Sequence, residues 1–134
     1  KAIDIGVVCA ADAEVVINDF DLITLVKNLV GNAIRYTPAG GRVDLSVLAT
    51  AAATTLVIED SGPGIPDAER ERVFDPFYRV LGSNEIGSGL GLSIVRAIAV
   101  RVGATLALGF ADQPSCSGLR VTVTFPAVEK RFCD

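Results

Sequence analysis

One polar row on a predicted helix has the residue types of a cation and phosphate site. Asn28, Asn32 and Arg35 stand among apolar residues that recur at helical spacing. At about 100° per residue they share a stripe of about 60°, and Tyr36 borders it. An amide oxygen can ligate Mg²⁺ without adding charge, and an arginine can bind a phosphate through two hydrogen bonds. The row therefore indicates a site for Mg²⁺ and phosphate, with an ordinary solvated helix face as the alternative.

A lone carboxylate, Asp60, ends an apolar strand-like run and precedes the sequence SGPGIP. Its two glycines, Gly62 and Gly64, leave backbone that a ligand can approach closely, and the carboxylate accepts hydrogen bonds. The exocyclic amine of adenine is a suitable donor, whereas guanine would present a carbonyl there and be repelled. The pattern favours an adenine site, although a simple turn would have the same residues.

A third stretch, residues 87–92 (GSGLGL), runs directly into a predicted helix. Several unhindered N–H groups can converge there on an anion at the helix N-terminus, which is how proteins bind phosphate. The dinucleotide fingerprint is excluded because position 92 is Leu, and residues 82–88 lack the lysine of a P-loop. The stretch predicts a phosphate contact only in combination with the other two.

The elements that must position these residues alternate in type along the chain. Their order predicts an α+β fold, a two-layer α/β sandwich with a mixed, largely antiparallel sheet of about five strands and about three helices on one face. The expected elements are an opening hairpin of strands 3–8 and 14–17, a helix from an N-cap at Asp21 to a stop at Pro38, a second hairpin of strands 42–48 and 54–59, two helical turns over 67–72, a helix over 92–102 capped by Gly103, and strands 105–110 and 119–125.

Composition restricts the class of protein. With 134 residues, 50% apolar and 21% charged, residues 1–134 are expected to form one domain. A net charge of −4 argues against a nucleic-acid surface, which requires clustered Lys and Arg. No apolar run approaches the roughly 18 to 20 residues of a membrane span, and the chain opens without a signal peptide, so direct membrane contact is not expected. An opening at Lys1 rather than Met suggests a fragment of a longer protein.

The three cysteines, Cys9, Cys116 and Cys133, form no CxxC pair, and the chain contains no histidine. This excludes a zinc site of the usual kinds within the chain. Core or tail thiols in a reducing, cytosolic setting are the expected interpretation.

Four motifs resemble those of histidine kinases, in the family's order and over nearly the whole chain. Residues 28–38 (NLVGNAIRYTP) resemble the N box and residues 60–66 (DSGPGIP) the first glycine box. Residues 74–79 (FDPFYR) are similar to the F box, and residues 87–92 to the second glycine box. The resemblance implies the Bergerat-type ATP-binding sandwich that this family shares with gyrase-type ATPases.

The same resemblance implies roles for individual residues. Asn32 is the implied Mg²⁺ ligand, Asp60 meets the adenine amine, and Arg79 reaches the terminal phosphate. No residue is a convincing general base, and Asn28 and Arg79 are the catalytic candidates. The implied ATP-binding set is Asn28, Asn32, Arg35, Tyr36, Asp60, Gly62, Gly64, Ile65, Phe77, Gly87, Gly89, Leu90, Gly91 and Leu92. Phe74 and Phe77 either anchor their loop to the core or belong to a lid near ATP, and both can hold.

The expected function is binding of Mg²⁺-ATP and transfer of the γ-phosphoryl group to a histidine on an adjacent dimerisation domain, outside this chain. The resemblance further implies a downstream response regulator receiver domain, and a cytoplasmic location within a parent kinase anchored in the bacterial inner membrane. Two alternatives remain: an anti-sigma-factor-type serine kinase of the same superfamily, and a degenerate nucleotide-binding interaction module.

Overall fold

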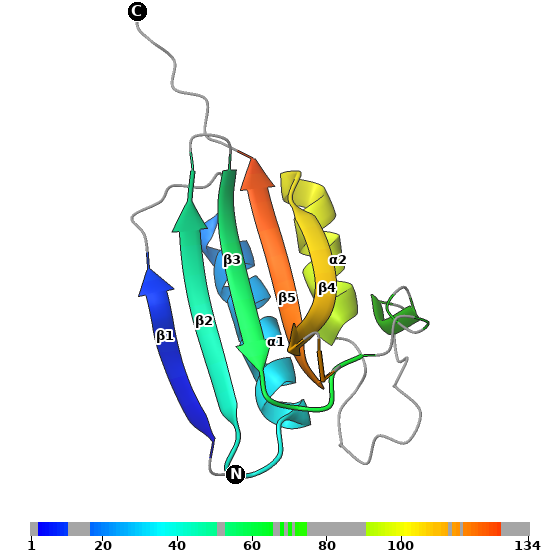
Figure 1. Ribbon diagram of the computed structural model, residues 1–134. Helices are drawn as coiled ribbons and strands as arrows, with labels where there is room; N and C mark the ends of the chain where they lie inside the picture. Colours follow the sequence, from blue (N-terminus) through cyan, green and yellow to red (C-terminus); the bar gives the residue numbers. More distant parts are fainter. Residues whose placement is uncertain are drawn as a thin grey trace, which may run out of the picture.

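Five strands form one sheet, and two α-helices cover one of its faces (Figure 1). The computed structural model describes residues 3–10, 17–50, 53–65, 68, 70, 72–74, 91–112, 114–115 and 117–126. The elements are β1 (Asp4–Ala10), α1 (Asp19–Tyr36), β2 (Arg42–Ala49), β3 (Ala53–Asp60), the 3-10 helix η2 (Arg72–Phe74), α2 (Gly91–Val102), β4 (Thr105–Asp112) and β5 (Ser117–Pro126). This confirms the predicted α+β sandwich. The helices in the described part of the chain are α1, α2 and the 3-10 helix η2.

The sheet order is β1-β2-β3-β5-β4, and every neighbouring pair is antiparallel except β1 with β2. The second predicted hairpin is confirmed as β2 and β3. The opening hairpin is not formed by β1, which pairs in parallel with β2. Parallel neighbours need a crossover, and α1 supplies it. The apolar pattern of residues 3–8 predicted a strand but held no information on its partner; residues 14–16 lie outside the described residues, and Ile17 is not in a strand.

Helix α1 begins earlier than predicted, because Asn18 rather than Asp21 is its N-cap. The Asn18 Oδ1 accepts a hydrogen bond from the Asp21 backbone N–H at 2.8 Å, and the Asn18 Nδ2 donates to the Asp21 Oδ2 at 3.0 Å. Asp21 therefore occupies the third helical position, where an acidic side chain commonly pairs with the N-cap. The helix ends as predicted before Pro38, at the C-cap Thr37, whose N–H donates to the Ala33 carbonyl at 3.1 Å.

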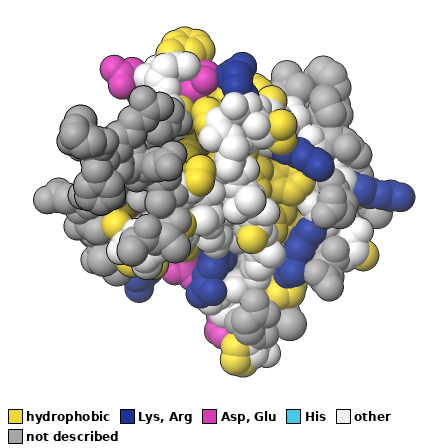
Figure 2. All heavy atoms as spheres, turned by 90° about the horizontal axis from the view of Figure 1, so that it is seen from above, with side chains coloured by type: hydrophobic (Ala, Val, Ile, Leu, Met, Phe, Trp, Pro, Cys, Tyr) yellow, Lys and Arg dark blue, Asp and Glu magenta, His cyan; other side chains and the backbone are white. Residues whose placement is uncertain are grey.

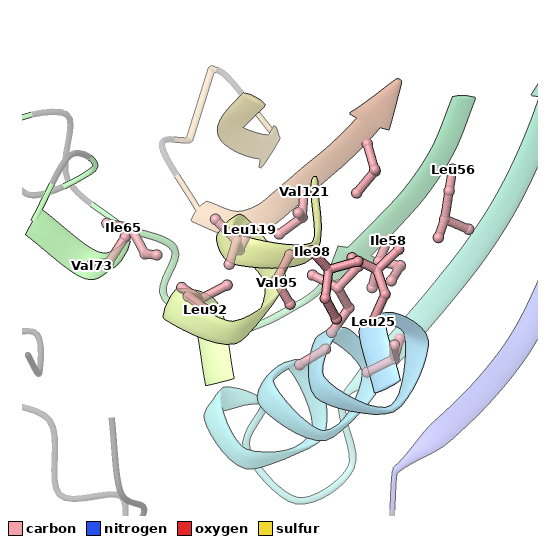
Figure 3. Packing of buried hydrophobic residues seen from close by; sticks show 14 of the residues in the cluster. Leu25, Leu56, Ile58, Ile65, Val73, Leu92, Val95, Ile98, Leu119 and Val121 are labelled. Carbon is pink, nitrogen blue, oxygen red and sulfur yellow. The ribbon is translucent and has the colours of Figure 1, made fainter. Parts of the chain in front are cut away.

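The core fills the space between the sheet and the helices (Figure 3). Alternate residues of the strands face the helices, so Ile58 of β3 and Val121 of β5 are buried as register partners. The cluster continues to Ile65 and Val73, which lie next to each other beyond the sheet. The hydrophobic core therefore extends to the loop that follows β3.

The two α-helices run in opposite directions along the sheet (Figure 1). As a result, the end of α1, the end of β3 and the start of α2 lie at the same end of the molecule. The opposite end, seen in Figure 2, has hydrophobic side chains in the middle of its described part, with several Lys and Arg side chains beside them and a few Asp and Glu side chains farther out. No helix in the described part of the chain is long and apolar enough to cross a membrane.

Candidate functional site

Asp60, the last residue of β3, is a buried carboxylate that is only half satisfied. Its Oδ1 accepts hydrogen bonds from the backbone N–H groups of Gly62 at 2.9 Å and Leu119 at 3.1 Å. Its Oδ2 has no hydrogen-bond partner among the described residues. Desolvation by burial raises the pKa of Asp60, and the two backbone hydrogen bonds oppose that rise. The fold therefore orients the carboxylate through one oxygen and leaves the other as a free acceptor.

The glycines after Asp60 are packed against the protein's own backbone. A Cβ at Gly62 would lie 2.7 Å from the Tyr36 carbonyl oxygen, and one at Gly64 would lie 2.6 Å from the Gly118 carbonyl oxygen. Gly64 also has φ +81°, a backbone angle that residues other than glycine rarely adopt. From the sequence, these glycines were expected to let a ligand approach the backbone closely. In the structure, packing against α1 and β5 is sufficient reason for them.

The polar row on α1 faces the start of α2. The Asn28 Nδ2 donates to the Thr24 carbonyl at 2.8 Å, which leaves its Oδ1 directed toward Gly91, 3.6 Å from where a Cβ would stand there. Asn32, one turn later, is 9% exposed, yet its amide forms no hydrogen bond with any residue that the structure describes. Arg35 and Tyr36 are half-buried on the same helix.

The Asn32 amide and the Asp60 Oδ2 both remain accessible to a ligand. Among the described residues, no fully buried side-chain nitrogen or oxygen lacks a hydrogen-bond partner. The Asn32 amide and the Asp60 Oδ2 have no such partner, and they must therefore reach solvent-accessible space. A ligand lying between α1 and the end of β3 could satisfy both.

The N-terminus of α2 completes the described part of the site. Gly91 is its first residue, and Leu92 is buried in the core, which fixes the helix to the sheet. The other residues of the predicted phosphate loop and lid lie outside the described residues: Gly87, Gly89, Leu90, Phe77 and Arg79. The helix start therefore lies beside Asn28, and the phosphate contact of the loop and of the helix start stays a prediction.

Phe74 belongs to η2 and is half-buried against the core cluster. The Arg96 guanidinium lies over its ring, 5.4 Å from the centroid. The anchoring interpretation therefore holds for Phe74. Half of the predicted two helical turns over 67–72 lies outside the described residues, and the described half has 3-10 geometry at Ala68 and at Arg72, the first residue of η2.

Sequence reasoning missed Gly118 and Leu119, which reach the site through the backbone. Leu119 orients Asp60, and the Gly118 N–H donates to the Gly62 carbonyl at 2.6 Å. The available signal was a glycine at the start of a predicted strand, which marks a turn or a close backbone approach. Gly118 has φ +72°, and a Cβ there would overlap the Asp60 carbonyl oxygen.

The family model of histidine kinase-, DNA gyrase B- and HSP90-like ATPases matches residues 18–129. The chain therefore belongs to this ATPase family. Within the family it is similar to sensor histidine kinases. It is 42% identical over 113 residues to the sensor protein kinase PmrB of Pseudomonas aeruginosa, a match that covers 83% of this chain and 23% of PmrB. It is 41% identical over 86 residues to the swarming motility regulation sensor protein RssA of Serratia marcescens, covering 63% of this chain and 18% of RssA.

Solved structures agree with this placement. The mycobacterial sensor histidine kinase MprB superimposes with a TM-score of 0.87 at 32% identity, over 96% of this chain and 86% of that one. The ATP-binding domain of PrrB from Mycobacterium tuberculosis gives a TM-score of 0.75 at 26% identity, over 95% and 82%. The chain is thus a catalytic ATP-binding domain of the sensor histidine kinase type, and it spans about a fifth of the length of the curated relatives named above.

Proposed function

We propose that this domain binds Mg²⁺-ATP and donates the γ-phosphoryl group to a histidine on an adjacent dimerisation domain of the same sensor kinase. The observation that carries the proposal is the half-satisfied Asp60 carboxylate, buried at the end of a strand with one free oxygen. The chain itself contains no histidine, so the acceptor belongs to another part of the kinase. Residues 1–134 act as its single catalytic domain.

Adenine is recognised by the free oxygen of Asp60. The exocyclic amine of adenine donates to the Asp60 Oδ2, and a guanine carbonyl in its place would be repelled by the carboxylate. The Tyr36 carbonyl oxygen lies against Gly62, and Ile65 follows Gly64 in the same segment. We assign Tyr36 and Ile65 to the purine contact. The two hydrogen bonds that fix the Asp60 Oδ1 support the assignment of Asp60 to adenine, because a carboxylate that is already oriented loses little freedom when the base binds.

The residues present fit a magnesium ion. Asn32 has an unpartnered amide, and the Asn28 Oδ1 is open toward the start of α2. No group of three His, Cys, Asp or Glu side chains that could hold a metal occurs in the part of the chain that the structure describes. An amide oxygen together with nucleotide phosphates and water is the ligand set that Mg²⁺ prefers. When bound, Mg²⁺ neutralises charge on the phosphates, and Asn32 is the residue we assign to hold it.

The protein's contribution to transfer is positioning and electrostatics, which phosphoryl transfer mainly requires. Arg35 lies on the amide-bearing helix and contacts the phosphates. The N-terminus of α2, with Gly87, Gly89 and Gly91 before and at its start, supplies backbone N–H groups to them. Arg79 reaches the terminal phosphate, and Phe77 lies in the lid segment that faces the acceptor domain.

The relatives support a wider setting for this domain. A downstream response regulator receiver domain takes the phosphoryl group from the histidine. The domain is cytoplasmic, and its kinase is anchored in the inner membrane. Support comes from the solved structure of the cytoplasmic segment of histidine kinase QseC, which resembles this chain with a TM-score of 0.61 at 27% identity.

A thermal-shift series with ATP, ADP and GTP, with and without Mg²⁺, tests the binding step. Adenine nucleotides should raise the melting temperature, and the gain should grow with ligand concentration relative to its Kd. A flat response to every nucleotide would instead support a degenerate interaction module.

Labelling with γ-³²P-ATP tests the transfer step. The chain alone should acquire no acid-labile, alkali-stable phosphate, because it has no imidazole. A separately supplied histidine-bearing dimerisation domain should become labelled slowly, since separation forfeits the effective concentration that tethering provides. Stable phosphate on a serine of the partner would favour the anti-sigma-type serine kinase instead.

A further inference from the structure

The β4–β5 hairpin touches both ends of the segment that follows Asp60. Phe110 of β4 and Leu119 of β5 are register partners. The Leu119 N–H orients the Asp60 Oδ1 at 3.1 Å. The Phe110 ring lies against Gly64, where a Cβ would stand 2.8 Å from its Cδ1. One cross-strand pair therefore contacts the recognition carboxylate and the glycine four residues later.

Arg70 adds a third contact to the same segment. Its Nε donates to the Ile65 carbonyl at 3.1 Å, and its guanidinium carbon lies 4.8 Å from the centroid of the Phe110 ring. A cation over an aromatic face is an attractive contact, and it sets the position of the arginine relative to β4. The stack of Arg70 on Phe110 thus holds the far end of the segment, as Leu119 and Gly118 hold its near end.

The Phe110 ring is not part of the main core. The core cluster and the partly buried residues packed on it, as far as the structure describes the chain, include Leu106 and Leu108 of β4 but not Phe110. Phe110 is half-buried near the end of the strand, and its contacts include Gly64 and Arg70. A side chain in this place can influence the loop more than the stability of the sheet.

We propose that Phe110 and Arg70 are positioning residues of the adenine pocket. They hold the backbone of residues 62–65 so that the free oxygen of Asp60 meets the purine amine at the correct distance and angle. The inference rests on the proposed ATP binding. Its physical basis is that a hydrogen bond weakens steeply with misalignment, so a small displacement of the segment reduces discrimination between an amine and a carbonyl on the purine.

The decisive measurement is the ratio of the Kd for inosine triphosphate to the Kd for ATP, determined by calorimetry with Mg²⁺ on the 134-residue chain. Inosine carries a carbonyl in place of the adenine amine. Phe110→Leu, which removes the ring face, should lower this ratio by about 3- to 10-fold, the range expected for weakening one hydrogen bond. Arg70→Met, which keeps the apolar stem, should lower it in the same direction. Phe110→Tyr should retain the wild-type ratio.

A merely structural role would not move that ratio, because a smaller folded fraction weakens both nucleotides equally. Arg120→Gln is the matched control: Arg120 follows Leu119 and pairs with Glu59 at 2.9 Å, both partly exposed. It should leave the ratio unchanged. An unchanged ratio in Arg70→Met, or in a folded Phe110→Leu, would overturn the positioning role while ATP binding stands. If the wild type binds neither nucleotide, the proposed function fails and this inference fails with it.

Discussion

Two aspartates at opposite ends of the sandwich are equally buried and differently satisfied. Asp21, near the start of α1, and Asp60, at the end of β3, are both 6% exposed. The Asp21 Oδ1 accepts from the Arg101 Nη2 at 2.7 Å, and its Oδ2 accepts from the Asn18 side chain. Both of its oxygens have protein partners, whereas the Asp60 Oδ2 has none among the described residues. A free acceptor atom, rather than burial, therefore distinguishes Asp60, the proposed binding carboxylate, from Asp21, the structural one.

The same contrast appears between two asparagines of the first helix. Asn18 uses both its amide oxygen and its amide nitrogen to cap α1. Asn32 uses neither toward any described residue. Asn32 lies in the last part of α1, and the end of α1 is at the same end of the molecule as the end of β3 and the start of α2 (Figure 1).

The largest effect is expected from Asp60→Asn, the substitution that breaks the comparison at its functional end. It keeps the shape and replaces one acceptor oxygen with a donor amide. ATP binding should weaken by about 1–3 kcal/mol, the cost of spoiling a charge-assisted hydrogen bond. Calorimetric titration with ATP measures this. Unchanged affinity in a folded variant would remove Asp60 from the site.

Asn32→Ala should come next, with a loss of about tenfold in the ATP affinity measured with Mg²⁺ and little loss without it. The reason is that the variant lacks the assigned ligand while its fold keeps every described hydrogen bond. Titrations in Mg²⁺ and in chelator give the two affinities. A full Mg²⁺ effect in the variant would show that another group holds the ion.

Asp21→Asn applies the same substitution at the structural end. It weakens the pair with Arg101, whose side chain is 62% exposed, so the free energy of unfolding should fall by only about 1 kcal/mol. ATP affinity should be unchanged, because Asp21 lies at the other end of α1. Urea unfolding and calorimetry check the two parts. A loss of ATP affinity here would contradict the division between the two carboxylates.

The smallest effect concerns pH. Burial raises the pKa of Asp60 above its usual 3.8. The native state therefore holds this proton more tightly than the unfolded state does, and the resulting stability is present below pH 3.8 and is lost as pH rises through the raised pKa. The two backbone hydrogen bonds to Asp60 oppose this rise. Unfolding of wild type and Asp60→Asn across this window should show the loss only in the wild type.

Substitutions in the predicted lid separate nucleotide binding from phosphoryl transfer to the histidine domain. Phe77→Ala or Arg79→Ala should reduce transfer to the supplied histidine domain more than nucleotide binding, since both residues lie in the segment expected to face that domain. The ratio of the transfer rate to the ATP affinity measures the difference. Equal losses would show that the lid is part of the nucleotide pocket.

The sequence by itself was sufficient for features that depend on neighbours a few positions away. The apolar period of α1, the alternation in β2 and β3, and the glycine cap at Gly103 depend on local geometry, and all are confirmed. The polar row that contains Asn28 and Asn32 follows from the same period. Asp60 stood out because a charged residue at the end of an apolar strand is conspicuous in the sequence.

Tertiary structure decided the features that depend on residues far apart in the chain. The parallel pairing of β1 with β2 follows from the crossover through α1, and strand periodicity does not encode a partner. The hydrogen bond from Leu119 to Asp60 joins residues 59 positions apart. Its donor is a backbone N–H, which every residue except proline possesses. Side-chain identity carries no signal for such a contact, so the orientation of the Asp60 carboxylate could be learned only from the folded chain.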